Sequence, residues 1–250
     1  QSMSLYNEAL KTDPQPQFSP TRTIPYEILA QVYEASGNIV GQLLTHARAL
    51  LTIGDTATAL TYIENASKAA PETGEPGVLL ARIRLMENNL PAARQAIDEA
   101  FTSGTETPEA RSLHAEILKQ EGKPEQATAE LQKAVDADPK NLDYRQNLAQ
   151  NLADTGDKQT AAKTMQTGLA DGGWLDPAYL HTYSIYLLDL NDLEEAVRVL
   201  EQADQLAPYS GDVQFSLARA YHKAGKTRQA ASALRRATEV NPELQKQILD

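Results

Sequence analysis

The sequence predicts an all-α fold in which antiparallel helix hairpins stack on one another as an α-solenoid. Two stretches, GKPEQATAELQKAVDADP from Gly122 and GKTRQAASALRRATEVNP from Gly225, share Gly, Lys, Gln, Ala, Leu, Ala and Pro at matched places. Six windows of 34 residues align almost the whole chain, with Asp176 alone between two of them. The windows are 40–73, 74–107, 108–141, 142–175, 177–210 and 211–244. A repeat of this length is typical of stacked helical hairpins.

The middle of each window carries a signal for a tight turn. Its fifteenth position holds only glycine or asparagine: Gly54, Asn88, Gly122, Gly156, Asn191 and Gly225. These two residues accept the left-handed backbone conformation that commonly ends a helix. Each window is therefore predicted to contain two helices joined at this position.

Four further columns predict how the two helices of a hairpin pack. The eighth, twentieth and twenty-seventh positions hold small residues in every window, which lets two helices approach closely, and the twenty-fourth holds a bulky aliphatic that fills the contact. The thirty-second position is proline in four windows, at Pro71, Pro139, Pro208 and Pro242. Proline there predicts the end of the second helix, because it disfavours helical conformation in the residue before it.

The two ends are less regular. Residues 1–3 resemble a tag remnant and are excluded from the fold prediction. Residues 4–39 are predicted to form an atypical helix pair with a proline-rich loop at 15–25, and the alternative is an array cut in mid-repeat. Residues 243–250 are predicted to start a capping helix, because the last repeat needs a polar outer face.

Composition and motifs argue against several classes of function. The net charge of −11 disfavours binding to nucleic acid, which requires clustered lysine and arginine. No apolar run is long enough to span a bilayer, so direct membrane insertion is not expected. Cysteine is absent, no histidine pair has metal-ligand spacing, and no nucleotide-binding or nucleophile motif occurs, so neither enzyme activity, a metal nor a cofactor is expected.

Several notable side chains have ordinary structural interpretations. His46 and His114 occupy the seventh column, where a large packing residue is expected. Tyr179, Tyr183 and Tyr186 recur at helical spacing, and packing between repeats is favoured over an aromatic ligand cage. Trp174 lies where two hairpins join and is predicted to fill a gap between repeats rather than to bind a ligand.

The period and the columns resemble the tetratricopeptide repeat family over residues 40–244. The usual tryptophan of the fourth position is replaced in every window, by Leu43, Gly77, Arg111, Arg145, Leu180 and Gln214. The resemblance implies a right-handed superhelix whose concave groove is lined by the first helix of each repeat. It also implies a protein-interaction scaffold that binds a partner protein or an extended peptide.

In this family the groove is lined mainly from the second, fifth, ninth and twelfth positions of each repeat. Carried onto this chain, the resemblance predicts partner contacts from Leu44, Arg48, Leu51, Val78, Arg82, Leu85, Glu116, Lys119, Gln146, Asn147, Gln150, His181, Ile185, Leu188, Phe215, Arg219 and His222. Arg48 and Arg82 could grip a partner carboxylate, or they could pair with an acid of the chain such as Glu75 or Glu116.

The resemblance suggests a role in a bacterial multi-component assembly such as polysaccharide export or pilus biogenesis, including self-association through the end repeats. The alternatives are a peptide-sensing regulatory receptor and a docking domain of a larger enzyme. The sequence does not decide the compartment, and the bacterial periplasm is favoured over the cytoplasm.

Overall fold

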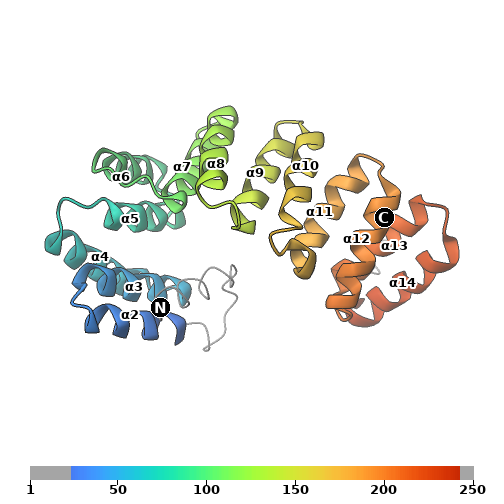
Figure 1. Cartoon of the computed structure of the whole chain (residues 1–250), viewed down its shortest axis with the longest axis horizontal. Helices are drawn as coiled ribbons and strands as arrows, with labels where there is room; N and C mark the ends of the chain where they lie inside the picture. The colour runs from blue at the N-terminus through green and yellow to red at the C-terminus, as the bar shows by residue number, and fades with distance from the viewer. Residues whose placement is uncertain (1–23, 243–250) are drawn as a thin grey trace. The chain divides into compact units, whose positions relative to one another are not determined.

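A computed structural model describes residues 24–242, and the regular structure of these residues is helical throughout (Figure 1). The helices are α2 (Ile24–Ala35), α3 (Ile39–Thr52), α4 (Thr56–Ala69), α5 (Glu75–Met86), α6 (Leu90–Thr102), α7 (Pro108–Gln120), α8 (Pro124–Ala137), α9 (Leu142–Asp154), α10 (Lys158–Gly168), α11 (Pro177–Asp189), α12 (Leu193–Leu206), α13 (Gly211–Lys223) and α14 (Thr227–Val240). A short 3-10 helix, η2 (Gly173–Leu175), precedes α11. The all-helical fold predicted from the sequence is confirmed.

The chain divides into two compact units, unit 1 (residues 1–134) and unit 2 (residues 135–250). In each unit the helices of a hairpin pack side by side, as with α3 and α4, α5 and α6, α9 and α10, and α11 and α12 (Figure 1). The first helices of neighbouring windows also contact each other: α3 with α5 and α5 with α7 in unit 1, and α9 with α11 and α11 with α13 in unit 2. We call the side formed by these helices the first-helix face of each unit.

The turn inside each window has the backbone conformation that its sequence predicts. All six residues of the fifteenth column have positive φ, including Asn88 (57°) and Asn191 (59°). In the first window the Gly54 N–H donates to the Leu51 carbonyl and the Asp55 N–H to the Leu50 carbonyl, and the other windows repeat this pair. This is the Schellman arrangement, which satisfies carbonyls that the helix end leaves open.

The packing columns form the core. Every residue of the eighth, twentieth and twenty-seventh columns is buried, and so is the aliphatic column except for the half-buried Leu234. The second helices α4, α8, α12 and α14 each end two residues before the proline of their window. The sequence prediction of closely packed helix pairs is confirmed by this burial.

One hairpin junction in unit 2 departs from the common pattern. Gly168 stands where five windows have alanine, and the ring of Tyr179 from α11 fills the space beside it. The Tyr179 hydroxyl donates to the Met165 carbonyl at 2.8 Å, so it satisfies a carbonyl near the end of α10. Gly173 packs against the same ring, since a Cβ there would lie 2.6 Å from Tyr179 Cδ1.

At the N-terminal end, α2 packs on α3 across a turn at Gly37, whose φ is +71°. The predicted loop 15–25 ends earlier than expected, because α2 begins at Ile24 and places Pro25 in its first turn, where proline costs no hydrogen bond. The predicted tag remnant 1–3, the first helix of the predicted N-terminal pair, the rest of that loop and the capping helix 243–250 lie outside the described residues.

Candidate functional site

Four of the predicted contact residues lie in the core instead of on the surface. Leu44, Val78, Leu85 and Leu188 are only 1, 2, 8 and 3% exposed. The physical reason is that neighbouring first helices touch each other and thereby cover aliphatic side chains at the fifth and twelfth positions. Leu51 is half-buried and packs against the same core as Leu44. These side chains stabilise the stack and offer little surface to a partner.

The first-helix face of unit 1 carries an ion-pair triad that joins three helices. Arg48 on α3 donates from Nη2 to Glu109 Oε2 at 3.0 Å, and Arg82 on α5 donates from Nη2 to Glu109 Oε1 at 2.9 Å. Glu109 stands in the first turn of α7, where the helix dipole favours a negative charge. The structure thus supplies an internal carboxylate for both arginines, and it is neither Glu75 nor Glu116.

The charges of this triad hold one another in the ionised form. Burial by itself opposes ionisation of Glu109, but the two guanidinium groups outweigh it and lower the pKa of this carboxyl. Burial likewise opposes the charge of Arg48, and Glu109 outweighs it, so the pKa of Arg48 is raised. Glu116 is exposed and Lys119 half-buried further along α7.

In unit 2 the predicted glutamines are already engaged within the chain. Gln146 donates to the Thr182 hydroxyl at 3.3 Å. Gln150 donates to Asp154 at 2.7 Å and accepts from the Tyr186 hydroxyl at 3.3 Å. The bonds to Thr182 and Tyr186 tie α9 to α11, so the two glutamines position the first helices, and Asn147 beside them is exposed.

The next pair of first helices presents a different surface. His181 Nε2 lies 2.8 Å from Ser216 Oγ and so links α11 to α13; burial lowers the pKa of His181 although Asp212 opposes this. Ile185 on α11 is 45% exposed, while on α13 Phe215 is half-buried and Arg219 and His222 are exposed. Among residues 24–242, Arg219 forms no ion pair. We call Ile185, Phe215, Arg219 and His222 the α11–α13 patch.

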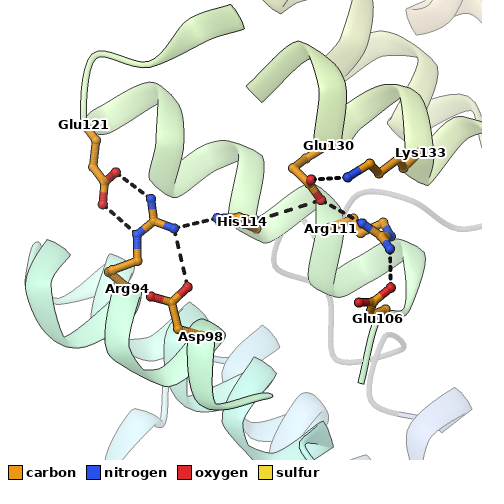
Figure 2. A network of polar contacts seen from close by, with 8 residues as sticks. All are labelled: Arg94, Asp98, Glu106, Arg111, His114, Glu121, Glu130 and Lys133. Carbon is orange, nitrogen blue, oxygen red and sulfur yellow. Dashed lines mark hydrogen bonds and ion pairs between the residues drawn. The ribbon is translucent and has the colours of Figure 1, made fainter. Parts of the chain in front are cut away.

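A polar network in unit 1 was not foreseen from the sequence (Figure 2). Arg94 on α6 makes a two-pronged ion pair with Glu121 at 2.8 and 2.6 Å, and its Nη1 lies 2.6 Å from His114 Nε2. On the other side of the histidine, Arg111 donates to Glu130 of α8 at 2.9 Å. Burial and then the charge of Arg94 lower the pKa of His114, so it accepts from Arg94 as a neutral ring. The seventh-column position of His114 indicated a packed side chain, but its polar partners could not be identified from the sequence.

The aromatic side chains at these positions are packed within the chain. Tyr179, Tyr183 and Tyr186 are buried, His46 packs on the Tyr62 ring at 5.3 Å, and His114 meets the Phe101 ring edge-on. Trp174 is half-buried against the core of unit 2, and the Arg198 guanidinium lies 4.5 Å from its ring centroid. Because Trp174 and Arg198 belong to consecutive windows, this cation–π contact joins two repeats.

Asp143, in the first turn of α9, supports a prediction of pH dependence. Burial, and then the nearby charge of Asp176, raise the pKa of Asp143 to about 6. The folded state therefore keeps a proton that the unfolded chain loses near pH 4, so this residue lowers stability as the pH rises from about 4 to 6. Asp143→Asn is expected to raise the free energy of unfolding by about 1 kcal/mol at pH 7.5, a modest value because the half-buried carboxyl remains partly screened by water.

Urea unfolding followed by circular dichroism at pH 4 and pH 7.5 checks this expectation. At pH 4 the variant should match the unmodified chain, because Asp143 is then largely protonated in the folded state. Asp212→Asn is the matched control, since Asp212 holds the same column of its window and is exposed. If both variants raise the free energy of unfolding equally at pH 7.5, the pH-dependent loss of stability is not due to Asp143.

Within residues 24–242, no helix combines the length and apolarity needed to cross a membrane. The same residues contain no group of three or more histidine, aspartate or glutamate side chains suited to a metal ion.

Comparisons with known proteins agree with this architecture. The structure of YrrB, described as a repeat protein with an unusual peptide-binding site, matches 72% of this chain and 92% of its own at 18% identity and a TM-score of 0.60. PilF of Pseudomonas aeruginosa matches 82% of this chain and 93% of its own at 16% identity, with a TM-score of 0.70. MamA of Desulfovibrio magneticus matches 68% of this chain and 96% of its own at 14% identity, with a TM-score of 0.60. At these identities the likeness concerns the fold.

No curated protein sequence matches the chain. The sequence model of the tetratricopeptide repeat does match, at residues 50–117, 118–179 and 187–248. These segments cover most of the chain and agree with the stacked hairpins and the turn columns. Proteins built in this way are in general protein-interaction scaffolds without catalytic activity. The chain belongs to the tetratricopeptide repeat family.

Proposed function

We propose that the chain is a scaffold that binds an extended segment of a partner protein on the α11–α13 patch. The bound segment carries an acidic side chain that pairs with Arg219 and an apolar side chain that packs on Ile185 and Phe215. The patch suits this role because it combines an exposed cation with apolar surface on two adjacent helices. YrrB, a repeat protein described as having an unusual peptide-binding site, shares the fold and offers a precedent for such a function.

The observation that carries the proposal is a contrast within the ninth column. Arg48 and Arg82 hold a carboxylate of their own chain at 3.0 and 2.9 Å, whereas Arg219 in the same column forms no ion pair within the described residues. The Glu109 carboxylate is therefore an example of the group to which an arginine of this column donates its hydrogen bonds. A partner carboxylate at Arg219 would reproduce a geometry that the chain already uses in unit 1.

An array of random twelve-residue peptides, incubated with the full chain, tests the proposal. Bound peptides should be enriched in aspartate or glutamate next to an aliphatic or aromatic residue. For a selected peptide, Arg219→Ala is expected to weaken the affinity about tenfold or more, because a charge-assisted hydrogen bond contributes about 1.5–3 kcal/mol. Arg228→Ala is the control, since Arg228 on α14 is also exposed and forms no ion pair within residues 24–242.

Two outcomes would oppose the proposal: peptides selected without regard to acidic residues, or equal weakening by both arginine variants. The narrower expectation of a place in bacterial polysaccharide export or pilus assembly remains a prediction. It requires the partner segment to be identified in such a machine.

A further inference from the structure

The opposite side of unit 2 contains an open groove that the proposed function does not use. It lies between the second helices α10 and α12, above the C-terminal half of α11, and has a volume of about 910 Å³. Tyr183, Leu187 and Ala162 line it together with polar side chains from α10 and from the start of α12. Figure 1 shows α10, α11 and α12 in sequence along this unit. Its size is that of a ligand pocket rather than of a packing defect.

The corresponding place in unit 1 is closed by the chain itself. His114 holds the seventh position of its window, as Tyr183 does in unit 2. Over His114 the side chains of Arg94, Glu121 and Glu130 reach across from α6, the end of α7 and α8 (Figure 2). Among the residues that the structure describes in unit 2, no side-chain network of this kind bridges α10 and α12 above Tyr183. The same position of the repeat is thus filled in one unit and open in the other.

At the base of the groove is a hydrogen-bonding group that the chain leaves unused. Tyr183 is only 2% exposed and lines the groove, yet its hydroxyl forms no hydrogen bond within residues 24–242. Tyr179, one turn earlier, shows the usual arrangement, since its hydroxyl donates to the Met165 carbonyl at 2.8 Å. Most of the Tyr183 side chain is buried, but its hydroxyl oxygen is not enclosed by the chain, so an external group in the groove can reach it and bind there.

The charges around this hydroxyl indicate the kind of group. Asp157 and Asp192 cap α10 and α12 from the two sides of the groove, and each side chain accepts a backbone N–H. Glu195 is paired with Arg198 at 2.6 Å. Within residues 24–242, Lys163 is then the one cation lining the groove that has no pairing carboxylate, against two aspartates. The balance favours a cationic ligand group.

We propose that this groove binds an extended segment of a second partner protein that carries a lysine or arginine side chain. The cationic group lies between Asp157 and Asp192, and a backbone carbonyl of the segment accepts a hydrogen bond from the Tyr183 hydroxyl. The exposed amides of Gln159 and Gln166 on α10 are placed along the groove to pair with further backbone groups. With the α11–α13 patch on the other side, one unit could hold an acidic and a basic segment at the same time.

The test uses the full chain labelled with ¹⁵N and three end-blocked peptides of eight residues. The peptides alternate alanine with lysine, with glutamate or with glutamine. The lysine peptide is expected to cause saturable shifts of backbone amides in α10 and α12, and the glutamate and glutamine peptides should bind at least several-fold more weakly. Tyr183→Phe is expected to lower the affinity for the lysine peptide about fivefold, since one hydrogen bond is lost.

Matched variants separate binding from folding. Tyr183→Phe should leave the unfolding midpoint unchanged, because the hydroxyl has no partner in the chain. Asp192→Asn keeps a side chain that can cap α12 but removes the charge. It too should lower the affinity for the lysine peptide about fivefold, while the helix content stays unchanged. Arg219→Ala should leave this binding unchanged, which distinguishes the groove from the α11–α13 patch.

Three results would overturn the proposal. The first is the absence of saturable shifts in α10 and α12 with the lysine peptide. The second is equal or tighter binding of the glutamate peptide. The third is unchanged affinity of the lysine peptide for Tyr183→Phe, which would show that the hydroxyl takes no part.

Discussion

Gly168→Ala is expected to lower the free energy of unfolding by about 3 kcal/mol, at the upper end of the usual cost of overpacking a core. A Cβ at this position would lie 2.1 Å from the Tyr179 hydroxyl oxygen and 2.9 Å from Arg145 Cδ. Tyr179 is fully buried and cannot move aside without losing its hydrogen bond to Met165. Chemical denaturation followed by far-UV circular dichroism measures the loss.

The chain itself suggests the compensating substitution. One window later the same two columns hold Ala203 and Val213, which are both buried in the core of unit 2. Tyr179→Val should therefore accept an alanine at position 168, although it is destabilising by itself because it leaves a cavity. In this background Gly168→Ala is expected to be neutral or stabilising, which gives a coupling energy of about 3 kcal/mol. Additive losses would show that the glycine is required for another reason.

The parts of the fold that the sequence predicts are those that depend on backbone conformation and on small side chains. The turn at the fifteenth column follows from the tolerance of glycine and asparagine for positive φ, and all six positions have it. The buried alanine columns follow from the closeness of paired helices. Such requirements act on a single position, so they recur in register and can be recognised in one sequence.

The contacts of long polar side chains could not be predicted in the same way. Arg48 pairs with a glutamate 61 positions later, two windows away, and nothing in the column pattern selects Glu109 over Glu75 or Glu116. A long side chain reaches several neighbours, and small differences in distance and solvation decide among them. For the same reason the engagement of Gln146 and Gln150 within unit 2, and the free hydroxyl of Tyr183, became visible only in the structure.

Burial shows a second limit of prediction from columns. The fifth position is buried at Leu44 and Val78 but half-buried at Phe215, although all three are apolar. Whether such a residue faces a partner depends on how closely the next first helix packs over it. That distance is set by several residues on both helices together, so no single column reports it.

Glu109→Gln is expected to lower the free energy of unfolding of unit 1 by about 2 kcal/mol at pH 7, below the usual 3–5 kcal/mol for a fully buried pair because these side chains are partly exposed. The substitution removes a carboxylate that holds Arg48 and Arg82 and leaves the two guanidinium groups without the charge between them. Thermal unfolding of both proteins at low ionic strength measures the difference, and 1 M salt should reduce it.

The pH dependence of this difference identifies its cause. The two arginines lower the pKa of Glu109 in the folded state below its value in the unfolded chain. The carboxylate therefore stabilises the fold at neutral pH, and this contribution is lost as the pH falls below about 4.5 and through the folded-state pKa. The difference between Glu109→Gln and the unmodified chain should thus shrink between pH 5 and pH 3.

Glu116→Gln on the same helix is the matched control, because Glu116 is exposed and its removal should change stability by less than about 0.5 kcal/mol. A loss from Glu116→Gln as large as that from Glu109→Gln would mean that any charge removed from α7 has this effect. A loss from Glu109→Gln that persists unchanged at pH 3 would mean that packing, and not the charge between two arginines, is responsible. If neither of these two results is obtained, Arg48 and Arg82 join three repeats of unit 1 through the one carboxylate of Glu109. A partner could then bind these arginines only after displacing Glu109.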